Sequence, residues 1–169
     1  MEALLNQGAL FEGLNEDGRR RLSAIVKRRS LQAGEYLFQL GENAEDFYIL
    51  VRGKVDLCLP MPLRGIVKDV SVESVGVGQA LGWSALVKPY RFTLSARATE
   101  PSEAVGLARR DLLNLFEAEP GIGYAFFTKV AEIVGIRLHT FQALWVRELQ
   151  RTLESEAQRH AGGSQAQPT

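Results

Sequence analysis

The middle of the chain alternates short apolar runs with glycine. Between residues 30 and 110, β-branched and aromatic residues gather in short segments. Regular spacing of such segments is typical of an all-β sandwich or barrel. Residues 60–65 contain two prolines and are expected to form an exposed hairpin connection, because proline cannot donate to a central ladder. The expected strands are 36–39, 47–51, 55–59, 67–75, 90–98 and 104–108.

Helical patterns lie on both sides of this barrel, which is expected to occupy residues 30–110. Residues 1–29 are expected to form an N-terminal helical segment, with Asn15 as an N-cap followed by two acidic residues. Residues 111–160 are expected to hold a short helix, 112–118, and a long one from about 121. The polar residues 161–169 are expected to be a disordered tail.

The long helix carries an apolar stripe at steps of three and four residues. It would be roughly 60 Å long at about 1.5 Å per residue, whereas a domain of about 120 residues is about 35 Å across. One barrel cannot cover such a helix, so we expect the stripe to pair with the same helix of a second copy. The alternative is an amphipathic helix folded back on its own domain. The expected homodimer interface is Val134, Leu138, Phe141, Trp145 and Leu149.

Composition restricts the classes of protein to consider. The chain has 169 residues, 46% of them apolar, and a formal net charge of zero. A neutral chain has no broad electrostatic attraction to nucleic acid or to a membrane surface. Its one cysteine, Cys58, excludes an internal disulfide, and no apolar run is long enough for a signal peptide or a spanning helix. We therefore expect a soluble, cytoplasmic protein.

Residues 76–98 contain the most distinctive chemistry. Glycines at 76, 78 and 82 lead into Ser84–Val87, which can form one helical turn before Pro89 ends it. A glycine turn at a helix start directs several N–H groups to one place, which suits a phosphate. Arg91 and Thr93 add a charge and a hydroxyl. The alternative is a glycine-rich turn that binds nothing.

Motifs in order along the chain resemble the cyclic nucleotide-binding domain family. Residues 33–38 (AGEYLF) and 46–55 (DFYILVRGKV) are similar to the family's A-G-E-x-(I/L)-F and D-x-F-Y-I-I-x-x-G-x-V. Residues 82–86 (GWSAL) and 89–96 (PYRFTLSA) resemble its phosphate-binding cassette, G-E-(I/L)-(A/S)-L and P-R-x-(A/S)-T-V-x-A. Residues 10–14 resemble its leading L-F-x-x-L. The resemblance covers about residues 10–145 and implies a mainly β jelly-roll barrel with N-terminal helices and a long C-terminal helix.

The resemblance also implies a binding site, and this chain differs from the family at two of its positions. In the family the cassette glutamate holds the ribose 2′-hydroxyl and the cassette arginine pairs with the cyclic phosphate. Trp83 stands at the glutamate position and Tyr90 at the arginine position, with Arg91 one place later. An indole accepts no hydrogen bond, so ordinary tight binding of cAMP or cGMP is not expected. The candidate ligand, a small anion or nucleotide, would meet Gly82, Trp83, Ser84, Ala85, Leu86, Tyr90, Arg91 and Thr93.

The function expected first is a ligand-sensing regulatory module that signals through its C-terminal helix. The alternative is a degenerate domain of the same type that binds no nucleotide and serves as a scaffold for dimerisation or protein interaction. A DNA-binding regulator would need a helix-turn-helix after the long helix, and the sequence printed here has no such pair. Either a stand-alone sensor or a fragment of a longer regulator fits that pattern, so no DNA partner is expected for this sequence.

A metal enzyme on a small jelly roll is a weaker hypothesis. Such sites need clustered histidines and carboxylates, and the two histidines, His139 and His160, both fall on the C-terminal helix. A haem sensor would use His139 or Cys58, and neither lies in a supporting motif. We therefore expect no enzyme activity, no metal and no resident cofactor.

Overall fold

The computed structural model describes residues 14–163, with side chains up to residue 159. The chain divides into two compact units, Met1–Val130 and Ala131–Thr169. The first unit contains the strands and the shorter helices, and the second contains the continuation of the last helix. The motif at 10–14 falls outside the described residues except for Leu14, which is buried.

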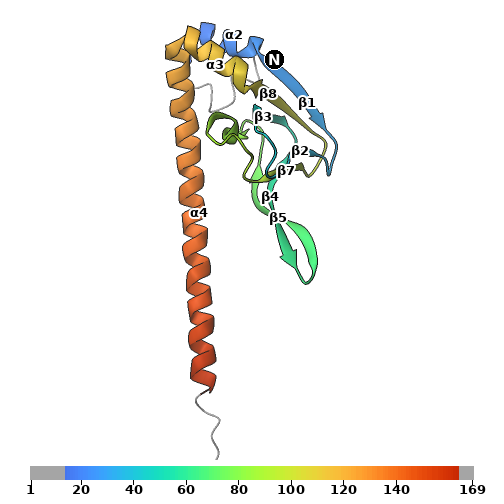
Figure 1. Ribbon diagram of the computed structural model, residues 1–169, viewed down its shortest axis with the longest axis vertical. Coiled ribbons are helices and arrows are strands. Elements are labelled where there is room, and N and C mark those ends of the chain that lie inside the picture. Colours follow the sequence, from blue (N-terminus) through green and yellow to red (C-terminus); the bar gives the residue numbers. More distant parts are fainter. Residues whose placement is uncertain (1–13, 164–169) are drawn as a thin grey trace, which may run out of the picture. The chain divides into compact units, whose positions relative to one another are not determined.

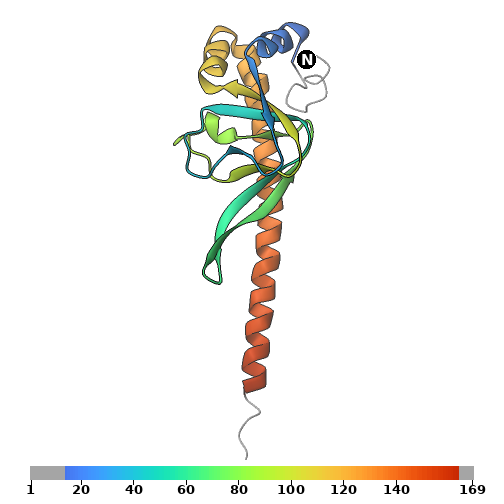
Figure 2. The same ribbon diagram turned by 90° about the vertical axis from the view of Figure 1, so that its right-hand side faces the viewer.

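Two antiparallel sheets form the body of the first unit (Figures 1 and 2). The first has the strand order β1-β8-β3-β6, and the second has the order β2-β7-β4-β5. The strands of the first sheet are β1 (Val26–Leu31), β8 (Ser102–Ala108), β3 (Asp46–Arg52) and β6 (Ala80–Leu81). Those of the second are β2 (Tyr36–Phe38), β7 (Ser95–Ala98), β4 (Val55–Leu63) and β5 (Ile66–Val75). The sandwich and the long C-terminal helix confirm the expected fold class.

Strand β3 lies at the centre of the core. It pairs with β8 on one side and with β6 on the other, and residues 47–51 are all buried. A continuous apolar run is the sequence pattern of a strand covered on both faces. This strand therefore holds β6, and the cassette that follows β6, against the core.

In the described part of the N-terminal region, the helix ends earlier than expected. Helix α2 (Glu16–Ala24) begins at the predicted cap, where Asn15 Oδ1 accepts from the Gly18 N–H at 2.8 Å. The helix ends before Val26, and Val26–Leu31 pairs along its whole length with β8. The prediction of helix to residue 29 is therefore wrong. Pairing with a central strand overrides the helical preference of a charged segment.

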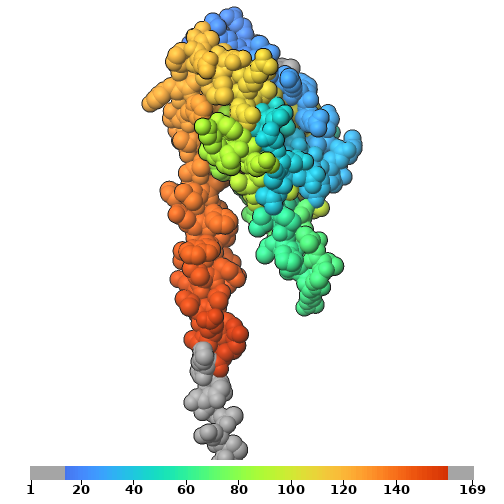
Figure 3. Space-filling view, in the orientation of Figure 1, coloured from blue at the N-terminus to red at the C-terminus, as the bar shows by residue number. Residues whose placement is uncertain are grey.

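The hairpin of β4 and β5 is longer than expected, because the strand continues through both prolines to Leu63. Strand β7 pairs with β4 only at residues 55–58. Pro60 and Pro62 are two residues apart, so their missing N–H groups fall on the same edge, the one that β7 does not reach. Figure 3 shows this hairpin standing out from the rest of the first unit.

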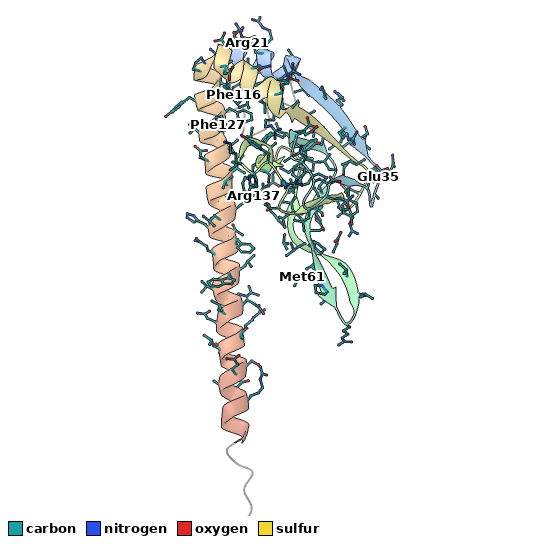
Figure 4. All side chains as sticks on the ribbon, in the orientation of Figure 1. Arg21, Glu35, Met61, Phe116, Phe127 and Arg137 are labelled. Carbon is teal, nitrogen blue, oxygen red and sulfur yellow. The ribbon has the colours of Figure 1, made fainter. Side chains whose placement is uncertain are left out.

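Helix α3 (Arg109–Ala118) leads directly into α4 (Pro120–Gly163), whose first residues complete the core. Phe126 is fully buried, with its ring 5.4 Å from Phe47 and 5.1 Å from Phe116 between centroids. Phe116 also contacts Phe127, as the labelled side chains in Figure 4 show. A Cβ at Gly123 would lie 2.9 Å from Phe116 Cβ, so a glycine lets the two helices approach. Val130, the last residue of the first unit, is also buried.

The second unit is a single helix, the part of α4 from Ala131 onward. A lone helix has no core of its own, so its apolar positions need a partner surface. Leu138, Phe141, Trp145 and Leu149 are each more than 40% exposed in the single chain. Among the described helices, none has a stretch long and apolar enough to cross a membrane. Helix α4 extends to Gly163, and residues 164–169 of the expected tail fall outside the described residues.

Candidate functional site

The first half of the cassette is a left-handed glycine followed by a 3₁₀ turn. Strand β6 ends at Leu81, Gly82 has φ 77°, and the turn η2 covers Trp83–Leu86. This matches the short helical turn predicted from the glycine pattern. A Cβ at Gly82 would meet Asp46 O at 3.2 Å and both Tyr48 and Phe92 at 3.3 Å. Glycine is required here both for its backbone angle and for the close approach of β3.

Alanine at position 82 is therefore expected to destabilise the fold. The left-handed conformation and the close contacts together should lower the free energy of unfolding by about 1–3 kcal/mol, measured by urea denaturation. Gly76→Ala is the matched control, since φ there is not left-handed and a Cβ would meet only Gln79 Oε1, at 3.6 Å. Equal losses from the two substitutions would contradict the structural role of Gly82.

The backbone of this turn is partly occupied by its own hydrogen bonds. The Ala85 N–H donates to Gly82 O at 2.9 Å, and the Val87 N–H donates to Ser84 O at 3.4 Å. Ser84 and Ala85 are buried, whereas Trp83 and Leu86 are half-buried. Trp83 therefore presents part of its indole at the surface of the cassette and does not fill the interior.

Side chains in the second half of the cassette alternate between exposed and buried. Arg91 and Thr93 are exposed, and Phe92 between them is 5% exposed. The Arg91 guanidinium donates to Gly41 O at 2.8 Å, in the loop between β2 and β3. The expected site residues 82–86 thus lie together on one turn, while Arg91 is bonded to a different loop.

Phe92 occupies the inner face of the cassette. Its ring stacks on Phe38 with centroids 3.8 Å apart and an angle of 10° between the planes. Phe38 in turn stacks on Tyr48 at 5.9 Å. Burial is the main reason that the pKa of Tyr48 is raised to about 12, and the neighbouring Asp46 carboxylate adds to the shift. Three aromatic rings therefore fill the space between the cassette and the sheets.

Tyr90, at the expected arginine position, is half-buried and has a left-handed backbone with φ 59°. The guanidinium of Arg109 lies over its ring, 4.3 Å from the centroid. Arg109 is the first residue of α3. The sequence reasoning missed this contact, because no motif connects the two positions.

The sequence profile described as "Cyclic nucleotide-binding domain" matches residues 28–119, more than half of the chain. The chain belongs to the cyclic nucleotide-binding domain family. This confirms the resemblance inferred from the motifs. No curated protein matches the chain in sequence.

Solved structures with the family fold are similar to this chain over most of its length. A putative cyclic nucleotide-binding protein from Geobacter metallireducens is 29% identical with a TM-score of 0.63, over 77% of this chain and 92% of that one. The catabolite activator protein of Thermus thermophilus is 25% identical with a TM-score of 0.64, over 88% of this chain and 63% of that protein. The sensor domain of the transcriptional regulator DNR from Pseudomonas aeruginosa is 22% identical with a TM-score of 0.60, over 78% and 91%. The last of these shows the fold alone.

The family pattern contains a signal for Phe92 that the sequence reasoning overlooked. The cassette pattern P-R-x-(A/S)-T-V-x-A has a small residue where this chain has Phe92. A large ring at that position fills space that alanine or serine would leave open. The family cassette is thus altered here at Trp83, Tyr90 and Phe92.

The candidate metal and haem ligands lie on different elements of the described part of the chain. No group of three or more histidine, cysteine, aspartate or glutamate side chains is placed to hold a metal ion there. Cys58 is buried on β4, and burial raises the pKa of its thiol, which lowers its reactivity as a thiolate. His139 is exposed on α4.

Proposed function

We propose that this chain is a ligand-sensing regulatory module of the cyclic nucleotide-binding type that signals through helix α4. The observation that carries the proposal is the backbone of the cassette turn. Gly82 takes the left-handed conformation, the turn η2 follows directly, and β3 lies against it. Such a turn offers N–H groups to an anion.

The ligand is a small anion or nucleotide held differently from cAMP or cGMP in the family's usual site. No carboxylate stands at position 83 to accept from a ribose hydroxyl, and no guanidinium stands at position 90. Trp83 is instead half-buried in the cassette, and an aromatic ring at this position favours stacking on a planar group. No resident cofactor is required.

The output of the module is the pairing of α4 with the same helix of a second copy. The residues that support this interface are Val134, Leu138, Phe141, Trp145 and Leu149, which recur at steps of three and four. A ligand changes such an assembly only by binding one arrangement of the helix better than another.

A second candidate is a scaffold for dimerisation or protein interaction that binds no nucleotide. Phe92 favours it, because its stacking on Phe38 occupies the inner face of the cassette. The scaffold shares the interface on α4 with the sensor, so only the ligand separates the two.

Thermal unfolding with a panel of cAMP, cGMP, a cyclic dinucleotide and linear nucleotides distinguishes the candidates. A ligand at 100 times its Kd adds about 2.7 kcal/mol, a rise of about 5–10 °C in Tm for a chain of this size. We expect cAMP and cGMP to give no shift and another member to give one. Trp83→Ala should reduce that shift, whereas Lys68→Ala on the exposed hairpin should leave it unchanged. No shift with any member would favour the scaffold.

A further inference from the structure

The contact between Tyr90 and Arg109 connects the cassette to the helices that follow the barrel. The Arg109 guanidinium lies 4.3 Å from the centroid of the Tyr90 ring. It also donates to Ala44 O at 2.9 Å, and the Arg109 N–H donates to Glu45 O at 2.7 Å. Arg109 is thus fixed at three points, two on the loop before β3 and one on the cassette.

Ala44 closes this arrangement into a ring of contacts. Its N–H donates to Tyr90 O at 2.8 Å, while its own carbonyl accepts from Arg109. Ala44 is fully buried. Cassette, loop and helix start therefore meet at one residue, and a displacement of Tyr90 changes the surroundings of Arg109 directly.

The backbone of Tyr90 is held in an unfavourable conformation at this point. A bulky residue with φ 59° is unusual, and such conformations persist only where the surroundings over-determine them. Here the Tyr90 N–H donates to Val87 O at 2.9 Å, its carbonyl accepts from Ala44, and its ring lies under Arg109. The contact with Arg109 is one of three that keep this segment in place.

The contacts continue from Arg109 to the first turns of α4. Arg109 begins α3, which buries Leu112 and Phe116. The Phe116 ring lies 5.1 Å from Phe126 of α4, and Gly123 allows the close approach of the two helices. All of these residues belong to the first unit.

We propose that the cation–π contact of Tyr90 with Arg109 couples the order of the cassette to the order of α3 and the first turns of α4. In this chain the residue at the cassette's expected arginine position thereby faces a helix instead of a ligand phosphate. The signalling role of this coupling, which is to transmit the state of the cassette to α4, rests on the proposed function. The coupling itself is a property of the ligand-free chain.

Hydrogen exchange of the ligand-free protein tests the coupling without any ligand. Tyr90→Leu removes the aromatic face, and Arg109→Gln removes the charge but keeps an amide that can donate to Ala44 O. Cation–π contacts at partly exposed sites have strengths that correspond to changes of about two- to fivefold in opening. We expect Tyr90→Leu to raise exchange in α3 by that factor, and Arg109→Gln to raise it at residues 83–87. The double variant should exchange no faster than the faster single variant.

Two controls isolate the ring and the charge. Tyr90→Phe keeps the aromatic face and should exchange like the parent. Arg110→Gln makes the same change at the exposed neighbouring arginine and should also leave exchange unchanged. The proposal is overturned if each substitution affects only its own element, if the two effects add, or if Tyr90→Phe loosens α3 as much as Tyr90→Leu. A failed ligand screen would leave this result untouched, because no ligand is present.

Discussion

Replacing Phe92 by alanine is expected to lower the free energy of unfolding by about 3–5 kcal/mol. Phe92 is 5% exposed and stacks on Phe38 with ring centroids 3.8 Å apart. Alanine would remove this contact and leave a cavity beneath the cassette, and a packed interior closes such cavities only in part. Urea denaturation followed by circular dichroism measures the loss.

Thr93→Ala is the matched control for this substitution. Thr93 follows Phe92 directly and is exposed, so its replacement should change stability by less than about 0.5 kcal/mol. Phe92→Leu keeps most of the apolar volume and should fall between the two. If Phe92→Ala cost no more than Thr93→Ala, the ring would not be part of the packed core, and the argument that it fills the cassette would fail.

The fold could be predicted from the sequence because its signals are local. Glycines between apolar runs marked the turns, and Asn15 with its two acidic neighbours marked a helix start that the structure also has. The boundary between helix α2 and strand β1, which was predicted near residue 29, could not be located in the same way. Residues 27–30 are charged or polar and look solvated, yet they form an edge strand because β8 offers a complete set of backbone partners. Sheet pairing between distant segments leaves little trace in either segment alone.

In the candidate site, too, the features set by local sequence could be predicted and those set by distant contacts could not. A short helical turn after Gly82 was predicted at residues 84–87 and lies at Trp83–Leu86, since glycine and proline fix the backbone locally. The Tyr90–Arg109 contact was not predicted, because it joins a residue in the loop between η2 and β7 to the start of a helix after two intervening strands. Phe92 is an intermediate case. The cassette pattern has a small residue at this position, so the sequence shows that Phe92 is unusual. Only the structure shows that its ring packs on Phe38.

Replacing Phe141 by glutamate is expected to convert a homodimer into monomers of the 18.7 kDa chain, as measured by light scattering. Phe141 lies in the middle of the apolar stripe of α4 and is 62% exposed in the single chain. In a paired helix its ring would be covered, so glutamate would place an unpaired charge in each half of the interface. A penalty of this kind should weaken association on the order of a hundredfold or more.

Thr140→Glu adds the same charge at an exposed position outside the predicted stripe, because consecutive residues lie about 100° apart around a helix. It should leave the particle mass unchanged, so the comparison separates the effect of position from the effect of charge. The alternative, in which α4 folds back on its own domain, predicts a different pair of results. The parent would then already be monomeric, and Phe141→Glu would lower the free energy of unfolding without altering mass. A dimeric parent whose mass is unaffected by Phe141→Glu would place the interface elsewhere and remove α4 as the pairing element.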